Sequence, residues 1–515
     1  MPNPITPSAN PATTPNAIGI ETYIRQEEDL GKIVTTLMGG RLNDVPDHKE
    51  YIKQLDPKLH DVMDPNKRPN KVVNVDPDSP EYGSTRSINV NAPEGVGSEG
   101  KVRIEQVARI ALAFQKLIVK RSVGITFGNP VKYKATPDGE AEKALYDAVQ
   151  RVLKDCKEQT LNRKAARQLY GMTEVAERWY VTESKEPHTN YSKNPTNFKL
   201  RTVLFSPRFG DTLYPYFDEN RDMTAFSRLF SRKMPDGTAK TYFETYTAES
   251  FYMWEADGDR TASAKNWQMV EGYPKPNPFG KIPVIYGCQD EPEYEDVESL
   301  IARMEKLLSN FADTNDYHAS PKIKVKGRVN SFCKKGEAGA ILELDPDADA
   351  DYLEWSHAPE SIKQEYNTLK ELIHTLTQTP DISWDSVKGT NVSGVALKLM
   401  FMDSVLKVKD KEEIWLDYLT RRVNLIKAIL AVVDQQTFSQ AASSLFIEPE
   451  IVPYIVIDEK ERADIEMGLS GNKQLKSRKT AMRDLGIDNV EEEAKAIEEE
   501  EEAANAFTQG EPTFA

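Results

Sequence analysis

The chain has 515 residues and a formal net charge of -16, with 82 acidic and 66 basic side chains. This length exceeds one ordinary hydrophobic core, so we expect at least two domains. A protein that grips nucleic acid is normally basic, so the charge argues against tight static DNA binding, whereas an acidic conduit for sliding DNA and plain solubility both fit it.

The cysteines Cys156, Cys288 and Cys333 lie far apart and form no CxxC motif. This spacing argues against a disulfide framework or a zinc cluster and suits a reducing cytoplasm. No apolar run approaches the ~18 residues of a membrane span, and the N-terminus lacks the pattern of a secretory signal.

The first half of the chain predicts helices followed by a sheet. Residues 1–18 are rich in Pro, Asn, Thr and Ser, which is typical of a disordered arm. Periodicity then predicts helices over 20–38, 101–123, 140–156 and 161–170, with mostly loop over 56–100. Short alternating runs from 172 to 285 predict an antiparallel sheet with hairpins, including a turn at 235–237.

Two helices, each with one narrow apolar seam, bracket a small α/β insert. The second helix spans 361–377, and the seam of the first is formed by Val297, Leu300, Ile301, Met304, Leu307 and Leu308. A narrow seam suits a ring in which the helix pair packs against neighbouring subunits. An antiparallel hairpin within one chain is the alternative.

The insert between these helices has expected strands at 323–325 and 341–344, around Lys334 and Lys335. It also has alternating acidic residues, for which we expect a solvated loop: Asp345, Asp347, Asp349 and Asp351. The run is not an EF-hand, because that motif needs Gly and Glu where Ala350 and Ser356 stand. The alternatives to a solvated loop are weak binding of a divalent cation and docking of a basic partner.

A very long helical pattern runs over 395–433, which is roughly 60 Å at ~1.5 Å per residue. Such a helix needs an extended partner surface and favours an assembly over a compact enzyme. We expect its lysines to form surface pairs with Asp403, Glu412 and Glu413: Lys398, Lys407, Lys409 and Lys411. A strand over 445–456 and helices over 472–484 and 489–504 follow, with Gly486 as a helix cap and 505–515 disordered.

Motifs for catalysis or cofactor binding are weak. Residues 95–100 fit GxGxxG, but the preceding segment is polar and broken by proline, so we expect a linker. The six histidines form no HxxxH or HxH pair, and no Walker A, HExxH or GxSxG motif occurs. We therefore expect no enzyme activity, cofactor or metal. A soluble α/β nucleotide-binding enzyme that uses residues 95–100 is the alternative function.

The order of several short motifs resembles the portal (head-tail connector) proteins of tailed bacteriophages, in the SPP1-like family. The motifs span roughly residues 100 to 490 and are Gly128-Asn129-Pro130 with Tyr133, Tyr170-Gly171, 278–285, 309–315, 379–382 and 391–398. The resemblance implies an α+β, mainly α, portal fold. Its expected parts are a disordered arm (1–18), a wing (19–289), a stem helix (290–318), a clip (319–360), a second stem helix (361–379), a tunnel loop (380–394), a long wing helix (395–436), wing strands (437–470), a crown (471–504) and a disordered tail (505–515).

The resemblance also implies a function and its partners. The chain would form a ring, a dodecamer, at one capsid vertex of the virion, after assembly in the host cytoplasm. Double-stranded DNA would pass through it without sequence recognition. The other implied partners are the terminase large subunit, a head-completion or adaptor protein, and the major capsid and scaffold proteins. No membrane is involved, and another head or neck structural protein is a further alternative.

Within this resemblance, one loop would line the tunnel and touch DNA: Trp384, Asp385, Ser386, Val387, Lys388, Gly389, Thr390, Asn391, Val392 and Ser393. Lys388 is its basic residue, and a single lysine contacts phosphate without reading sequence. An ordinary exposed turn is the alternative. The seam of the first stem helix would contact neighbouring subunits, and the lysines and aspartates of the insert would dock partners.

Overall fold

The computed structural model describes residues 19–74, 102–258, 266–318, 323–326, 349–352, 358–381, 399, 401–454, 459–470, 476–487 and 489–508. They divide into two compact units, Met1–Thr379 with Lys407–Pro453 and Pro380–Leu406 with Tyr454–Ala515, and each is described by itself. More described residues lie in helices than in strands, and the strands pair antiparallel, which confirms the α+β, mainly helical, class. In the part of the chain that the structure describes, no helix is long and apolar enough to cross a membrane.

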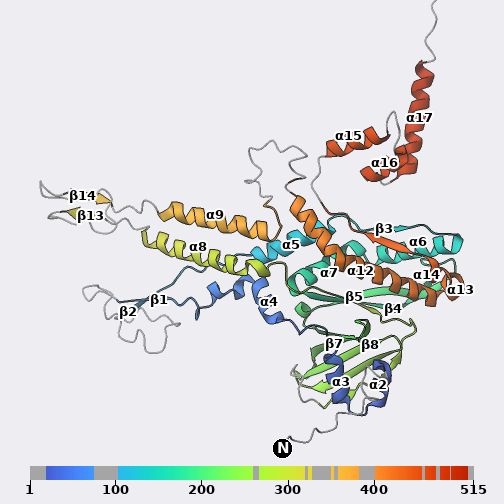
Figure 1. The fold of residues 1–515 in the computed structure, drawn as a ribbon, viewed down its shortest axis with the longest axis horizontal. Helices are drawn as coiled ribbons and strands as arrows, with labels where there is room; N and C mark the ends of the chain where they lie inside the picture. Colours follow the sequence, from blue (N-terminus) through green and yellow to red (C-terminus); the bar gives the residue numbers. More distant parts are fainter. Residues whose placement is uncertain are drawn as a thin grey trace, which may run out of the picture. The chain divides into compact units, whose positions relative to one another are not determined.

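A six-stranded antiparallel sheet forms one part of the larger unit, with the order β10-β9-β8-β7-β6 and β11 paired to β9. Side chains alternate between its two faces, as the alternating runs predicted. Helices α2 (Ile20–Gln26) and α3 (Leu30–Met38) cover the face that carries Phe243, Tyr252 and Trp254 (Figure 1). The strands are β6 (Thr212–Phe217), β7 (Met223–Lys233), β8 (Ala239–Thr247), β9 (Ser250–Asp257), β10 (Gln268–Met269) and β11 (Lys275–Pro276).

The main core joins a three-stranded sheet, β12-β4-β5, to helices from distant parts of the sequence. Trp179 of β4 and Trp415 of α12 are fully buried in it, and the Trp415 ring meets Phe127 edge-on at 4.8 Å between centroids. The elements are α5 (Phe114–Phe127), α6 (Glu140–Asp155), α7 (Glu158–Met172), β4 (Glu174–His188), β5 (Thr196–Phe205), β12 (Val284–Cys288) and α12 (Met402–Val433).

Shorter elements complete this unit. Strand β3 (Lys132–Ala135) pairs with β15 (Ile447–Glu450), and β1 (Lys71–Asn74) pairs with β2 (Val102–Glu105). The remaining short helices are α4 (His48–Leu55), η2 (Pro57–Leu59), η3 (Asp61–Met63), η5 (Pro207–Phe209), η7 (Glu295–Val297), α13 (Gln435–Phe438) and α14 (Ala441–Ser444).

Helices α8 (Glu298–His318) and α9 (Ala358–Leu376) lie side by side (Figure 1). The Arg303 guanidinium of α8 reaches the Glu365 carboxylate of α9 at 2.7 Å. Between these helices in sequence, β13 (Ile323–Lys326) pairs antiparallel with β14 (Asp349–Tyr352). The order of two helices around a small β-structure was predicted, but the partner of β13 is 349–352, whereas 341–344 lies outside the described residues.

The smaller unit contains α15 (Glu459–Ser470), α16 (Arg478–Leu485) and α17 (Val490–Thr508). Gly486 ends α16 with φ +90°, so its predicted role as a cap is confirmed, since this conformation strains other residues. Residues 459–470 form a helix in a segment that we expected to be strands, and α17 continues to Thr508, beyond the predicted end at 504.

The predicted helix over 101–123 is wrong in its first half. Residues Val102–Glu105 form β2, and α5 begins only at Phe114. Between them, alternate amide N–H groups donate to side chains of α8: Ala108 to Asp313 at 2.7 Å, Ile110 to Ser309 at 2.9 Å and Leu112 to Glu305 at 2.8 Å. The three acceptors recur every four residues on one face of α8. They satisfy the amide groups of the extended segment 106–113, which would otherwise bond within a helix.

Two other expectations have simple outcomes. The helix over 20–38 is broken in two, because the Asp29 side chain accepts from the Gly31 and Lys32 amides and starts α3 as its N-cap. The turn at 235–237 is confirmed: the Met234 amide donates to the Thr238 carbonyl at 2.8 Å, and Gly237 has φ +86°.

Candidate functional site

The sequence-predicted site residues have three different outcomes. The loop residues 384–393, Lys334, Lys335, Asp345 and Asp347 lie outside the described residues. Asp349 and Asp351 lie on strand β14, opposite Lys326 and Lys324 of β13, so at these two positions the expected acidic loop is wrong. The opposite charges of Lys326 and Asp349, which face each other in this register, favour the pairing and give a physical reason for a strand here.

The seam of α8 is largely filled within the chain. Val297, Ile301 and Met304 have 0% exposure and Leu307 has 7%, all in the main core, whereas Leu300 and Leu308 are half-buried. On α9, Leu369 and Ile373 are buried in the same core, but Leu372 and Leu376 are 42% and 53% exposed. Contacts of this seam with other subunits therefore stay a prediction, and the exposed leucines of α9 are the better test of them.

A buried carboxylate, Glu293, holds the start of the long helix. It precedes α8, and its side chain is 3% exposed. The Lys407 ammonium lies 2.5 Å from its Oε2 atom, and the Lys411 ammonium lies 2.9 Å from Oε1. The prediction of surface pairs is therefore wrong for Lys407 and Lys411. It is confirmed for Lys409, which pairs with Glu412 at 2.7 Å, and Lys398 lies outside the described residues.

The same lysine also binds the end of α9. The Lys407 ammonium donates to the Thr377 carbonyl oxygen at 2.9 Å. The Thr379 amide donates to the His374 carbonyl at 3.0 Å, while Gln378 adopts φ +53°, which is the pattern of a Schellman cap. Thr379 is fully buried and Pro380 follows it, so the chain leaves the helix at a fixed point.

Glu293, Lys407, Lys411 and the Thr377 carbonyl thus form one cluster, which we call the Glu293 anchor. It ties together residues 377–379 and 407, the two described flanks of the segment that contains the predicted tunnel loop. Burial opposes ionisation of Glu293, but the two ammonium groups outweigh it and lower its pKa. Burial also lowers the pKa of Lys407 despite its carboxylate partner. The anchor is therefore a charged cluster away from water, in which each group depends on the others.

A second buried cluster fixes the middle of α12. Arg422 and Glu177 both have side chains with 0% exposure. The Arg422 guanidinium donates from Nε and Nη2 to the two Glu177 oxygens at 2.8 and 2.7 Å, and from Nη1 to Asn162 at 2.5 Å. Trp179 and Tyr418 donate to the same carboxylate at 2.6 and 3.2 Å. We call these five residues the Arg422 cluster.

Neither cluster was predicted from the sequence. The available signal for the second was that Arg422 lies three residues after Leu419 and four before Ile426, within the apolar stripe of the helix. A charged residue at such a position must find a buried partner. Glu177 could not be identified as that partner, because it lies 245 residues away.

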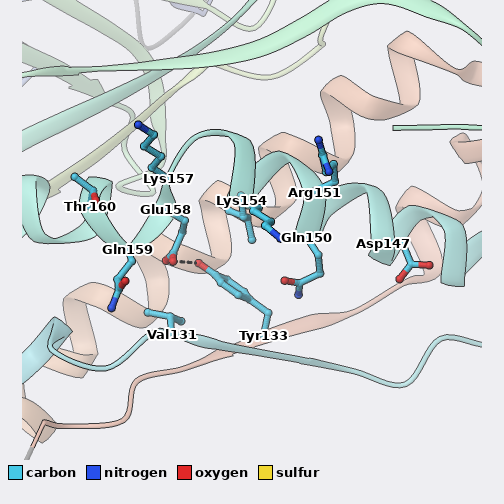
Figure 2. A pocket seen from close by; sticks show the side chains of 11 residues that line it. Val131, Tyr133, Asp147, Gln150, Arg151, Lys154, Lys157, Glu158, Gln159 and Thr160 are labelled. Carbon is cyan, nitrogen blue, oxygen red and sulfur yellow. Dashed lines mark hydrogen bonds between the residues drawn. The ribbon is translucent and has the colours of Figure 1, made fainter. Parts of the chain in front are cut away.

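A surface hollow of about 630 Å³ lies beside the Arg422 cluster, between α6, α7 and β3. In this hollow the Tyr133 hydroxyl donates to Glu158 at 3.0 Å (Figure 2). Glu158 Oε1 also lies 3.7 Å from Arg422 Nη1. Burial raises the pKa of Glu158. The cationic side chains of Lys157 and Arg151 extend away from Tyr133 and Glu158 in Figure 2. We therefore interpret the hollow as the solvent-facing side of the Arg422 cluster and not as a separate binding site.

The alternative nucleotide site at 95–100 lies outside the described residues, but its surroundings are described. Strand β2 follows it and pairs with β1 in a two-stranded antiparallel sheet, and the next helix begins only at Phe114. A dinucleotide site needs a helix directly after the glycine loop, because the helix N-terminus binds the pyrophosphate. The expectation that a helix follows was wrong, and the observed strand does not suit a nucleotide site.

Among the described residues, the buried polar clusters join elements to one another. The phage portal protein family, SPP1 Gp6-like, matches residues 105–506, most of the chain. The chain therefore belongs to this family, as the resemblance predicted, and a portal or head-tail connector is the class of protein that the family defines.

Three solved structures resemble the chain weakly, and each covers 72% of it and is itself covered to 88%. They are the neck of a native GTA particle computed with C12 symmetry (12% identity, TM-score 0.34), the virion of a native gene transfer agent particle (10%, 0.33) and the neck of an empty GTA particle computed with C6 symmetry (11%, 0.34). No curated protein matches the chain. Family membership therefore rests on the match over residues 105–506.

Proposed function

We propose that this chain is the subunit of a portal ring, a dodecamer at one capsid vertex of a virion, through which double-stranded DNA is packaged and ejected. The observation that carries the proposal is the family match, which extends over the α8–α9 pair, the long helix and the C-terminal helices alike. The exposed Leu372 and Leu376 of α9 support it, because paired apolar side chains on one helix face suit contact with a neighbouring copy.

The parts of the chain take the roles that the family implies. Helices α8 and α9 are the stem, 319–360 is the clip, 384–393 is the tunnel loop, α12 is the long wing helix and α15–α17 form the crown. The clip docks the terminase large subunit and later a head-completion protein, and the wing contacts scaffold and major capsid proteins. The portal itself is not an enzyme, so the ATPase of the packaging motor is another chain.

Electron microscopy of the purified chain tests the ring directly. We expect closed rings of about twelve subunits, from heterologous contacts that close on themselves. The variant with Leu372→Glu and Leu376→Glu should lose the ring while each subunit keeps its fold, because both side chains are exposed within one chain. Charges at Leu300 and Ile301 are a less specific test, since Ile301 is buried in the core. A stable monomer under all assembly conditions, or robust ATP turnover abolished by Gly97→Val, would overturn the proposal.

A DNA-packaging assay tests the loop. Lys388→Glu should leave rings intact but slow packaging, with a defect that varies with ionic strength, since the lysine contacts phosphate electrostatically. Deletion of 386–390 should be more severe. Lys164→Glu, at an exposed position of α7, is a matched charge reversal outside both the loop and the clip. Normal packaging by both loop variants would show that this loop does not act on DNA.

A further inference from the structure

A groove of about 540 Å³ lies between the two main sheets and the C-terminal end of α12. Aromatic and aliphatic side chains from separate segments line it, among them Tyr180, Phe198, Phe251, Phe279 and Val432. Phe198 and Val432 are 41% and 46% exposed, although both are large and apolar. We call this the aromatic groove.

Polar groups in the groove have unused hydrogen-bonding capacity. The Arg178 guanidinium lies over the Tyr246 ring at 4.7 Å and over the Tyr180 ring at 5.5 Å from the centroids. Its Nε atom is buried without a hydrogen-bond partner among the described residues. The Tyr246 hydroxyl, in a residue with 0% exposure, likewise makes no aligned hydrogen bond there, although the neighbouring Glu244 carboxylate and, above all, burial raise its pKa. Both groups can donate to a carbonyl oxygen.

The combination of aromatic walls and free donors fits a proline-rich segment. Polyproline II helices have no internal hydrogen bonds, so their carbonyl oxygens stay available, and their rings pack on aromatic surfaces. Recognition domains for such segments use aromatic-lined grooves with a few donors for this reason. The low conformational entropy of a proline-rich segment also reduces the cost of binding.

The chain carries such a segment directly before α2. Five of its first 18 residues are prolines: Pro2, Pro4, Pro7, Pro11 and Pro15. Helix α2, which follows, is tied to the end of β9 that leads into the groove: Tyr252 donates to Glu21 at 2.8 Å, and Arg25 pairs with Glu249 at 2.9 Å. Phe251, adjacent to Tyr252, lines the groove.

The segment is long enough to reach the groove. Tyr252 belongs to the sheet face under α2, whereas Tyr246 and Phe251 belong to the cluster on the other face, so the segment must pass around the sheet. The sheet β10-β9-β8-β7-β6 is roughly 20–25 Å wide, because neighbouring strands lie ~4.8 Å apart. The segment has to cover at most this distance to reach the other face. Eighteen residues in polyproline II span roughly 55 Å at ~3.1 Å per residue.

We infer that the proline-containing residues 2–15 bind in the aromatic groove of their own chain, with carbonyl oxygens accepting from Arg178 and Tyr246 and proline rings against Phe198 and Val432. Because the segment is tethered through α2, a weak intrinsic affinity is sufficient. This inference is independent of the ring and of DNA.

Photo-crosslinking in the full-length chain tests it. A benzophenone amino acid replaces Phe198 at the rim of the groove or, as a control, Phe209, which is 60% exposed and lies outside the groove. We expect crosslinks to residues 1–18 from position 198 and not from position 209. Alanine at the five prolines, or Val432→Glu at the exposed rim, should reduce them about tenfold, which corresponds to ~1.4 kcal/mol of binding.

Two further measurements keep the test decisive. Tyr246→Phe keeps the buried ring and removes only the hydroxyl, so it should weaken the crosslink while the thermal midpoint stays within a few degrees. In a mixture of isotope-labelled and unlabelled chains, crosslinks should join residues of the same label. Crosslinks between labels would assign the segment to a neighbouring chain and overturn the inference. It would also be overturned if crosslinks from position 198 never reached residues 1–18, or if they persisted in the alanine variant.

Discussion

Glu177 and Glu293 are both buried carboxylates that bind α12, but their cationic partners differ. Glu177 accepts hydrogen bonds from the planar guanidinium of Arg422, from Trp179 and from Tyr418, and its side chain is fully buried. Glu293 receives two lysine ammonium groups, one of which also holds the end of α9.

The difference between arginine and lysine suggests different mechanical roles. A guanidinium fixes the orientation of a carboxylate, whereas an ammonium on a four-carbon chain is a point charge that tolerates reorientation. We therefore expect the middle of α12 to be held rigidly. The Glu293 anchor, at the flanks of the proposed tunnel loop, should stay bound while the loop changes position.

The largest effect should come from the Arg422 cluster. Arg422→Met leaves Glu177 buried without its cation, which should lower the free energy of unfolding by about 3–5 kcal/mol, the usual cost of removing one partner of a buried pair. Chemical denaturation measures it. Arg421→Met is the matched control, because Arg421 is 51% exposed and pairs with Asp417 at the surface, where pairs contribute ~0–1 kcal/mol. Equal losses of unfolding free energy in the two variants would show that the buried pair contributes no more than the surface pair.

The anchor should be weaker and its failure local. Lys407→Met should cost about 2 kcal/mol, less than the arginine variant because Lys411 still neutralises Glu293. It should also raise the rate of proteolysis within 380–406, since the Thr377 carbonyl loses its donor. Lys409→Met, two residues away in an exposed pair with Glu412, should change neither quantity measurably. Unchanged proteolysis in the Lys407 variant would contradict the assignment of an anchor.

A smaller effect tests the additional donors of the Arg422 cluster. Tyr418→Phe removes the hydrogen bond to Glu177 Oε2, which still accepts from Arg422 Nη2. The expected loss of stability is about 1 kcal/mol, the usual value for one hydrogen bond whose acceptor stays satisfied. A loss as large as that of Arg422→Met would mean that the tyrosine, and not the arginine, determines the cluster.

The last effect concerns the pH dependence of stability and a carboxyl group that lacks a good partner. The Oε1 atom of Glu298 is buried without a hydrogen-bond partner among the described residues. Burial, together with the charges of Glu295 and Glu50, raises its pKa from 4.5 to about 7. The folded protein therefore binds a proton that the unfolded chain has released, so the free energy of unfolding should fall as the pH rises from about 4.5 to about 7.

Thermal unfolding across this pH range measures the effect. Glu298→Gln should reduce the slope, and Glu360→Gln on the exposed start of α9 should not. The expected direction is opposite to that for Glu293, whose lowered pKa gives stability that is lost as the pH falls below its ordinary value of 4.5. A slope that is the same in both variants would show that Glu298 does not titrate in this range.

The sequence by itself determined the elements whose signal is local. The helices over 140–156 and 161–170, the strands between 172 and 285, the seam helices and the long helix through Val433 follow from periodicity that one segment carries alone. The family resemblance was also determined there, because ordered short motifs do not depend on the fold being known. Such patterns show which face of an element must be buried, and the spacing of apolar residues within that element is enough to reveal it.

Tertiary structure decided what depends on distant partners. Residues 106–113 have apolar spacing for a helix, but Glu305, Ser309 and Asp313 of α8 capture their amide groups, about 200 residues away in sequence. Lys407 has the spacing of a surface pair but is buried on Glu293. A side chain's charge is visible in the sequence, whereas the low-dielectric site in which it finds its partner exists only after distant segments have packed together.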